Sequence, residues 1–217
     1  MIDEREPLVV LLHGLARTSR SMRPMAKYLE RHGFNTLCLS YPSTKAPVEK
    51  LAGQVRSAIR DQCGGRRLLH FVTHSMGGIL LRVMQRDEPM PNLGRAVMLC
   101  PPNKGSQIVD RLGGWRLFGW LNGPAGRQLV TGPLGLPETL GKANFEVGVL
   151  AGNRTFDPIL SRLLPGENDG KVAVSHMELE GQADFKIVPA THTFVMSNGE
   201  AQANTLAFLK NGAFIHP

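Results

Sequence analysis

Ser75 has the sequence surroundings of a catalytic nucleophile. The apolar run 68–72 before it predicts a buried strand, and the run 78–84 after it predicts a helix. A serine at a sharp turn from strand to helix, with glycine two positions later, matches the nucleophile-elbow pattern G-x-S-x-G, here with Thr73 in place of the first glycine. The alternative is a strand-end serine that only caps the following helix. The flanking strand and helix favour the elbow, in which the serine hydroxyl stands free at the end of a sheet.

The apolar run 8–12 predicts a second strand, which ends in His13-Gly14. A loop in this position can direct a backbone N–H group toward the oxyanion that forms when a serine attacks a carbonyl group. The N–H group of Met76 would be the second donor. A buried strand-end histidine would be the simpler interpretation of His13 alone. Beside the predicted elbow, we expect His13 and Gly14 to belong to the substrate site.

A general base and an acid are expected later in the chain, in the order serine, acid, histidine. The run 185–190 predicts a short strand, and His192 lies just past its end, where a general base can reach the serine. Two acids could orient this histidine. Asp169 lies in a loop, whereas Asp157 lies nearer to the end of the predicted strand 146–151 but is followed by proline and could start a turn.

Four short motifs resemble those of the α/β-hydrolase superfamily, and within it bacterial lipase- and esterase-like hydrolases. They are His13-Gly14, Thr-His-Ser-Met-Gly-Gly at 73–78, Asn168-Asp169-Gly170-x-Val172, and Thr-His-Thr-Phe at 191–194. The resemblance extends over essentially the whole chain. It implies that Ser75 is the nucleophile, His192 the general base and Asp169 the carboxylate that orients this base. It also implies that the backbone N–H groups of Leu15 and Met76 form the oxyanion hole.

The other elements alternate between strand and helix patterns, which is typical of a parallel sheet with helices on both faces. Further strands are expected at 34–39 and 95–100, and helices at 21–31, 48–61 and 202–210. The sequence therefore predicts an α/β fold with a mostly parallel sheet of about six strands in one domain over residues 1–217. By the resemblance, it is a minimal α/β-hydrolase fold that lacks the two strands with which this fold usually begins.

The segment 103–145 interrupts this alternation. It is rich in glycine and contains both tryptophans of the chain, and a long connection of this kind is usually a functional lid or a linker. Its large apolar residues argue against a linker. We expect the segment to form a cap over the serine, in which Trp115, Phe118 and Trp120 contact the substrate. The alternative is an irregular crossover whose tryptophans only pack against the sheet.

Composition is that of a folded domain that does not cross a membrane. Of the 217 residues, 42% are hydrophobic and 20% are charged, and no apolar run is long enough for a transmembrane helix. The acidic start of the chain leads directly into the first strand, which is not the pattern of a secretory signal. The three cysteines match no zinc-binding spacing. We expect free thiols, a cytoplasmic location, and no metal or other cofactor.

The charge balance is basic, with 25 Lys and Arg against 18 Asp and Glu. Arg17 and Arg20 follow the predicted oxyanion loop, and the segment 103–145 is also basic. A basic rim around an apolar cap could attract anionic substrates or the surface of an anionic membrane. Ordinary solvated surface is the alternative and is slightly favoured. No basic helix or aromatic-basic sheet pattern indicates nucleic-acid binding.

These residues together predict a hydrolase of carboxylic esters that acts on a small-molecule ester with an apolar acyl group. A thioesterase, acyltransferase, lysophospholipase or peptidase would use the same three side chains. A non-catalytic binding module on the same fold is a hypothesis of another class. Such a module would be expected to lack the serine, the acid or the histidine. All three are present in this sequence.

Overall fold

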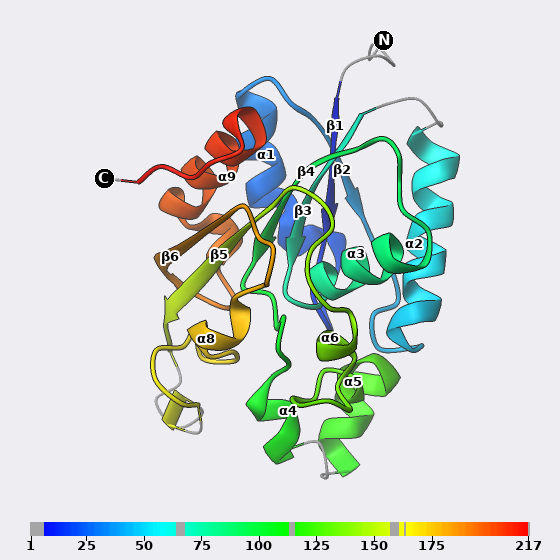
Figure 1. Ribbon diagram of the computed structural model, residues 1–217, viewed down its shortest axis with the longest axis vertical. Coiled ribbons are helices and arrows are strands. Elements are labelled where there is room, and N and C mark those ends of the chain that lie inside the picture. Colours follow the sequence, from blue (N-terminus) through cyan, green and yellow to red (C-terminus); the bar gives the residue numbers. More distant parts are fainter. Residues whose placement is uncertain (1–6, 64–67, 113–115, 157–160, 163, 217) are drawn as a thin grey trace.

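Six parallel strands form one sheet in the order β2-β1-β3-β4-β5-β6 (Figure 1). The computed structural model describes residues 7–63, 68–112, 116–156, 161–162 and 164–216. The strands are β1 Leu8–Leu12, β2 Asn35–Leu39, β3 Leu69–His74, β4 Leu93–Leu99, β5 Val147–Arg154 and β6 Asp184–Thr191. Each lies close to its predicted position, so the expected α/β class with a parallel sheet is confirmed.

Four longer helices cover the sheet, namely α1 Arg23–Arg31, α2 Val48–Cys63, α3 Met76–Asp87 and α9 Gly199–Asn211. The chain steps from β1 outward to β2 and then reverses across β1 to β3. Because crossovers between parallel strands are right-handed, this reversal places α1 on one face and α2 and α3 on the other. Accordingly, α1 contacts α9, and α2 contacts α3 (Figure 1). The reversal leaves a crevice between the carboxyl ends of β1 and β3, where such folds bind ligands.

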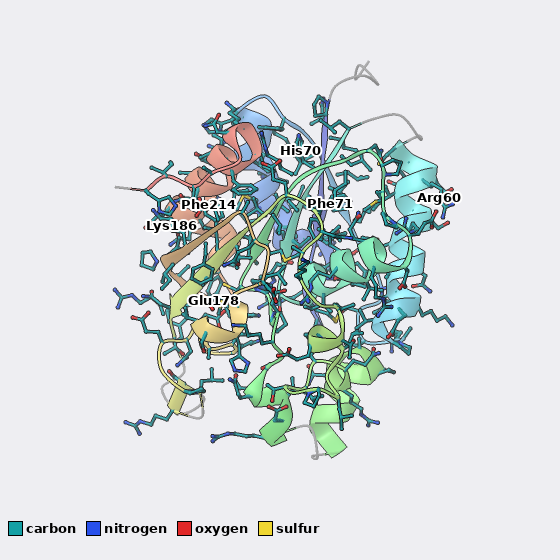
Figure 2. All side chains as sticks on the ribbon, in the orientation of Figure 1. Arg60, His70, Phe71, Glu178, Lys186 and Phe214 are labelled. Carbon is teal, nitrogen blue, oxygen red and sulfur yellow. The ribbon has the colours of Figure 1, made fainter. Side chains whose placement is uncertain are left out.

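The two strands at the reversal, β1 and β3, are buried along their whole length. Both β1 and β3 carry buried residues at every position, as expected of parallel strands that helices cover on both faces. Phe71 of β3 is fully buried, whereas Arg60 lies on the solvent side of α2 (Figure 2). The buried side chains of α2 recur at helical spacing, at Val48, Leu51, Ala52, Val55 and Ile59.

The helices of the segment 103–145 lie beyond the carboxyl ends of the strands, at the lower end of Figure 1, and its last residues return to the start of β5. It contains α4 Gln107–Leu112, α5 Arg116–Arg127 and α6 Leu136–Thr139. The buried Arg82 of α3 donates hydrogen bonds to the carbonyl oxygens of Asn103 at 3.1 Å, Pro137 at 2.9 Å and Gly141 at 2.7 Å. Burial lowers the pKa of Arg82 to about 10. This guanidinium group fastens both ends of the segment to the helix that follows Ser75.

The remaining described elements are short: the 3-10 helices η1 Ser19–Met22 and η2 Val195–Ser197, and helix α8 Val174–Met177. Within the described ranges, every helix is too short or too polar to cross a bilayer. Cys38 and Cys100 are free thiols, as the sequence predicted.

Candidate active site

Ser75 occupies the corner between the end of β3 and the start of α3. Its backbone has φ 52° and ψ −123°, a conformation that costs a non-glycine residue about 1–3 kcal/mol. Two hydrogen bonds hold the corner: the N–H group of Ser75 donates to the carbonyl of Leu99, and that of Gly78 donates to the carbonyl of Ser75, both at 2.9 Å. The strained turn therefore lifts the serine out of the sheet, as the elbow pattern predicted.

Glycines make room for this corner. A Cβ atom on Gly77 would lie 2.7 Å from the carbonyl oxygen of Leu12 and 2.9 Å from that of His13, so α3 can approach β1 only without a side chain there. A Cβ atom on Gly78 would lie 3.3 Å from the hydroxyl of Thr73. The threonine that replaces the first glycine of the pattern is thus accommodated by a second glycine after the serine.

The three side chains predicted to act together form a continuous hydrogen-bonded chain. The hydroxyl of Ser75 lies 3.1 Å from Nε2 of His192, and Nδ1 of His192 lies 2.6 Å from Oδ2 of Asp169. His192 follows directly after β6, and both it and Asp169 are buried. Because a carboxylate can only accept, Nδ1 carries the proton of that bond, and Nε2 is left to accept the serine proton.

A tight turn sets the orientation of the acid. The other carboxylate oxygen of Asp169, Oδ1, accepts hydrogen bonds from the backbone N–H groups of Lys171 at 2.9 Å and Val172 at 2.8 Å. Gly170, between Asp169 and Lys171, has φ 94°, which a residue with a side chain rarely adopts. The Asp-Gly-x-Val pattern is therefore the sequence of a turn that folds back on its own carboxylate. Asp157, the other candidate acid, lies outside the described residues.

Cys100 lies against this acid, a position that sequence reasoning did not single out. Its Sγ atom, a carboxylate oxygen of Asp169 and a ring nitrogen of His192 all lie within 4.8 Å of one another. Burial, followed by the charge of Asp169, raises the pKa of the Cys100 thiol well above its usual value. A protonated thiol is a poor metal ligand, so we interpret this group as packing beneath the acid. Its place at the end of a predicted strand was the available signal.

The two predicted oxyanion donors belong to segments that lie beside the serine. Met76 is the first residue of α3, so its backbone N–H is one of those that have no partner within the helix. Leu15 lines the same cavity as Ser75. The next residue, Ala16, has φ 53°, and its N–H group donates to the hydroxyl of Ser43 at 3.0 Å. This bond holds the loop after β1 in its bent course beside the serine.

His13 has a supporting position, away from the substrate site to which the sequence assigned it. It is fully buried and stacks on Tyr41, with ring centres 4.1 Å apart. Its Nδ1–H donates to the carbonyl of Gly14 at 2.8 Å, and its Nε2 accepts from the N–H group of Tyr41 at 3.3 Å. A Cβ atom on Gly14 would lie 3.1 Å from that of Ser75. Gly14 thus leaves room for Ser75, and the hydrogen bonds of His13 hold the loop.

A cavity of about 460 Å³ opens over Ser75 and His192. The segment 103–145 supplies much of its apolar lining, namely Ile108, Val109 and Leu129. Arg17 and Lys171 also line it. Of the aromatic residues predicted to contact substrate, Trp115 lies outside the described residues. Phe118 and Trp120 lie in α5, of which only the backbone is described at those positions.

Comparison with known proteins agrees with this geometry. Residues 9–204 match the sequence model of the alpha/beta hydrolase family. The chain belongs to that family. No curated protein sequence matches it. The structural resemblance to bacterial lipases and esterases that the short motifs indicated is likewise confirmed by the solved structures.

Several solved alpha/beta hydrolases share the fold at low sequence identity. Mature lipase BlEst2 from Bacillus licheniformis is 20% identical, with a TM-score of 0.73 over 98% of this chain and 94% of that chain. Phospholipase PlaB from Legionella pneumophila is 21% identical, with a TM-score of 0.67 over 79% of this chain and 45% of that chain. Lipase B from Aspergillus fumigatus is 14% identical, with a TM-score of 0.69 over 98% of this chain and 54% of that chain. The chain thus spans under half of PlaB and nearly all of mature BlEst2.

In this alpha/beta hydrolase, His74 holds the backbone beside the catalytic histidine candidate. Its Nε2–H donates to the carbonyl of His192 at 2.9 Å, and its Nδ1 is buried with no partner among the described residues. Burial, and then the charge of His192, lowers the pKa of His74 well below its usual value. Burial likewise lowers the pKa of His13 and of His70. Burial therefore favours the neutral form of these three histidines in the folded protein.

Stability should consequently fall as the pH drops below about 6.5, the usual histidine pKa. Below this pH, the unfolded chain binds protons that the folded chain does not bind. Each buried histidine therefore lowers the free energy of unfolding by up to about 1.4 kcal/mol for each pH unit. Urea unfolding at pH 7.5 and pH 5.5 measures this loss. His74→Gln should reduce the difference between the two pH values, whereas His32→Gln, at an exposed position, should not. Equal pH dependence in the two variants would contradict this assignment.

Proposed function

We propose that this protein is a serine hydrolase that cleaves carboxylic esters through an acyl-enzyme intermediate on Ser75. The observation that carries the proposal is the hydrogen-bonded chain from the Ser75 hydroxyl through His192 to Asp169, with its serine end at the floor of a cavity. A nucleophile, a base and a group that orients the base are the three parts that such chemistry requires.

The acylation half begins when Nε2 of His192 takes the hydroxyl proton of Ser75 and the oxygen attacks the ester carbonyl. The negative charge that develops on the carbonyl oxygen is stabilised by the backbone N–H groups of Leu15 and Met76. The imidazolium form of His192 is stabilised by the carboxylate of Asp169. The proton then passes from Nε2 to the leaving alcohol, and the acyl group stays on the serine.

The deacylation half repeats these steps with water in place of the serine. His192 removes a proton from the water molecule, the hydroxide attacks the acyl carbon, and the second oxyanion occupies the same position. The proton on Nε2 returns to the oxygen of Ser75 as the carboxylic acid departs. Asp169 holds the ring so that Nε2 faces the reacting oxygen in both halves.

The apolar cavity lining supports a substrate with an apolar acyl group. Ile108, Val109 and Leu129 come from the segment 103–145, which we propose to act as a cap over the serine. The fold neighbours include proteins described as lipases and as a phospholipase. Fluorophosphonate labelling and turnover of a panel of p-nitrophenyl esters test the proposal. A folded protein that is neither labelled nor active on any ester of the panel would overturn it.

Narrowing the cavity should shift the preference for acyl length. Ile108→Trp fills space that the acyl chain would occupy, and pocket contacts discriminate about 1–3 kcal/mol per methylene. We expect the ratio of kcat/KM for p-nitrophenyl octanoate over acetate to fall at least about tenfold. Leu134→Trp is the control, since Leu134 belongs to the same segment but is 93% exposed. An unchanged ratio in a stably folded Ile108→Trp protein would place the acyl chain elsewhere.

A further inference from the structure

Two cationic side chains reach the cavity that holds Ser75. Arg17 comes from the loop after β1, two residues beyond the proposed oxyanion donor Leu15. Lys171 comes from the turn that carries the proposed acid, Asp169. The two loops are far apart in sequence, and the fold brings them to the same cavity because one follows β1 and the other follows β5, two parallel strands whose carboxyl ends lie at the same edge of the sheet. Neither cation takes part in the hydrogen-bonded chain of Ser75.

These charges are not paired with an acid among the residues that the structure describes. Neither side chain forms an ion pair with any residue that the structure describes, and the described lining of the cavity contains no aspartate or glutamate. Burial, and then the charge of Arg17, lowers the pKa of Lys171, while Asp169 acts in the opposite direction. Arg17 is half-buried and Lys171 is exposed, but both side chains line the same cavity. Two cations beside one cavity raise the local concentration of anions.

We propose that Arg17 and Lys171 recognise an anionic group, a phosphate or a carboxylate, carried by the ester that Ser75 cleaves. The proposal rests on the proposed esterase function and narrows its substrate class. An arginine offers a planar pair of N–H donors and a lysine a mobile point charge, a combination suited to anionic oxygens. A cavity of about 460 Å³ can hold a short acyl chain and such a group together. The apolar lining then receives the acyl chain, and the two cations receive the charged end.

The anionic group could belong to the alcohol or to the acyl part of the ester, and matched substrate pairs distinguish these sources. The first pair is 1-butyryl-glycerol 3-phosphate and 1-butyrylglycerol, which differ in a phosphate on the alcohol side. The second pair is the p-nitrophenyl monoester of glutaric acid and p-nitrophenyl pentanoate, which differ in a carboxylate on the acyl side. For each pair, the ratio of kcat/KM for the anionic over the neutral ester is the readout. A substitution that lowers the activity on both esters of a pair by the same factor leaves this ratio unchanged.

The wild-type protein should favour the anionic member of at least one pair. Arg17→Gln and Lys171→Gln should each lower that ratio by about tenfold, the scale for one charge-assisted contact. Lys50→Gln is the control, since it removes the same charge from an exposed position on α2 and should leave the ratio unchanged. Raising the NaCl concentration should also lower the wild-type ratio. A preference in the first pair assigns the site to the alcohol side, and one in the second pair assigns it to the acyl side.

Failure of the anion site and failure of the esterase are separable. If the neutral esters are hydrolysed but neither pair shows a preference, or if Lys50→Gln lowers the ratio as much as the other two, the anion site is wrong and the esterase stands. Calorimetric binding of 1-butyryl-glycerol 3-phosphate and of glutarate monoester to Ser75→Ala protein requires no turnover. If the anionic ester of one pair binds Ser75→Ala protein more tightly than the neutral ester of that pair, and Arg17→Gln in the same protein removes the difference, the anion site is supported even without hydrolysis. Equal binding within both pairs would overturn it.

Discussion

Ser75→Ala is expected to abolish labelling by a fluorophosphonate and to lower ester turnover by about 10⁴-fold or more. The variant removes the oxygen that lies 3.1 Å from Nε2 of His192 and leaves the base without a proton to accept. The strained backbone at position 75 can accommodate alanine as well as serine, so the fold should persist. Mass spectrometry of the labelled protein and initial rates on p-nitrophenyl butyrate measure the two effects.

A second serine in the same cavity provides the matched control. The hydroxyl of Ser106 donates to the carbonyl of Lys171 at 3.0 Å, and Ser106 lines the cavity with Ser75. Ser106→Ala protein should still be labelled at a single serine. Full labelling of Ser75→Ala protein, or its loss in Ser106→Ala protein, would move the nucleophile and end the proposed mechanism.

Asp169→Asn is expected to lower kcat by about 10⁴-fold while the protein stays folded. The asparagine oxygen can keep the hydrogen bonds from the N–H groups of Lys171 and Val172, but its NH₂ group then faces Nδ1 of His192. A donor in that place favours the ring form with the proton on Nε2, which cannot accept the serine proton. Steady-state rates on p-nitrophenyl butyrate, together with thermal unfolding, measure the change.

Two other aspartates test the specificity of this effect. Asp184 also pairs with a histidine, His216 at 2.9 Å, but at the far end of β6 from His192. Asp184→Asn should therefore affect stability more than rate. Asp157→Asn should be nearly silent. A large loss of rate in Asp157→Asn with near-normal activity in Asp169→Asn would transfer the orienting role to Asp157 and leave the rest of the scheme intact.

Local sequence determined the sheet and the corner that carries the serine. Strands β1 and β3 are short apolar runs that are buried throughout, so their positions could be predicted from neighbouring residues alone. The strand-to-helix turn at Ser75 is also a local pattern of consecutive residues, although the reason for Gly77, its close approach to Leu12 of β1 and to His13, is visible only in the folded chain. The family resemblance supplied the order of serine, acid and histidine.

The tertiary structure alone decided which groups meet around that serine. Ser75 and His192 are 117 positions apart, and His192 and Asp169 are 23 apart, so no local pattern encodes their distances. Asp169 reaches His192 because the turn at Gly170 directs its carboxylate toward the end of β6. The same turn exposes Lys171 to the cavity.

The contacts of the residues around the site also depend on the tertiary structure. His13 was expected near substrate from its place at a strand end, but stacking on Tyr41 and two hydrogen bonds draw its ring behind the loop. Cys100 approaches Asp169 only because β4 and β5 are neighbours in the sheet. The side chain of Arg82 extends from α3 to backbone carbonyl oxygens of the segment 103–145. Sequence periodicity tells which side of an element is buried, whereas the partner that covers it depends on how the whole chain packs.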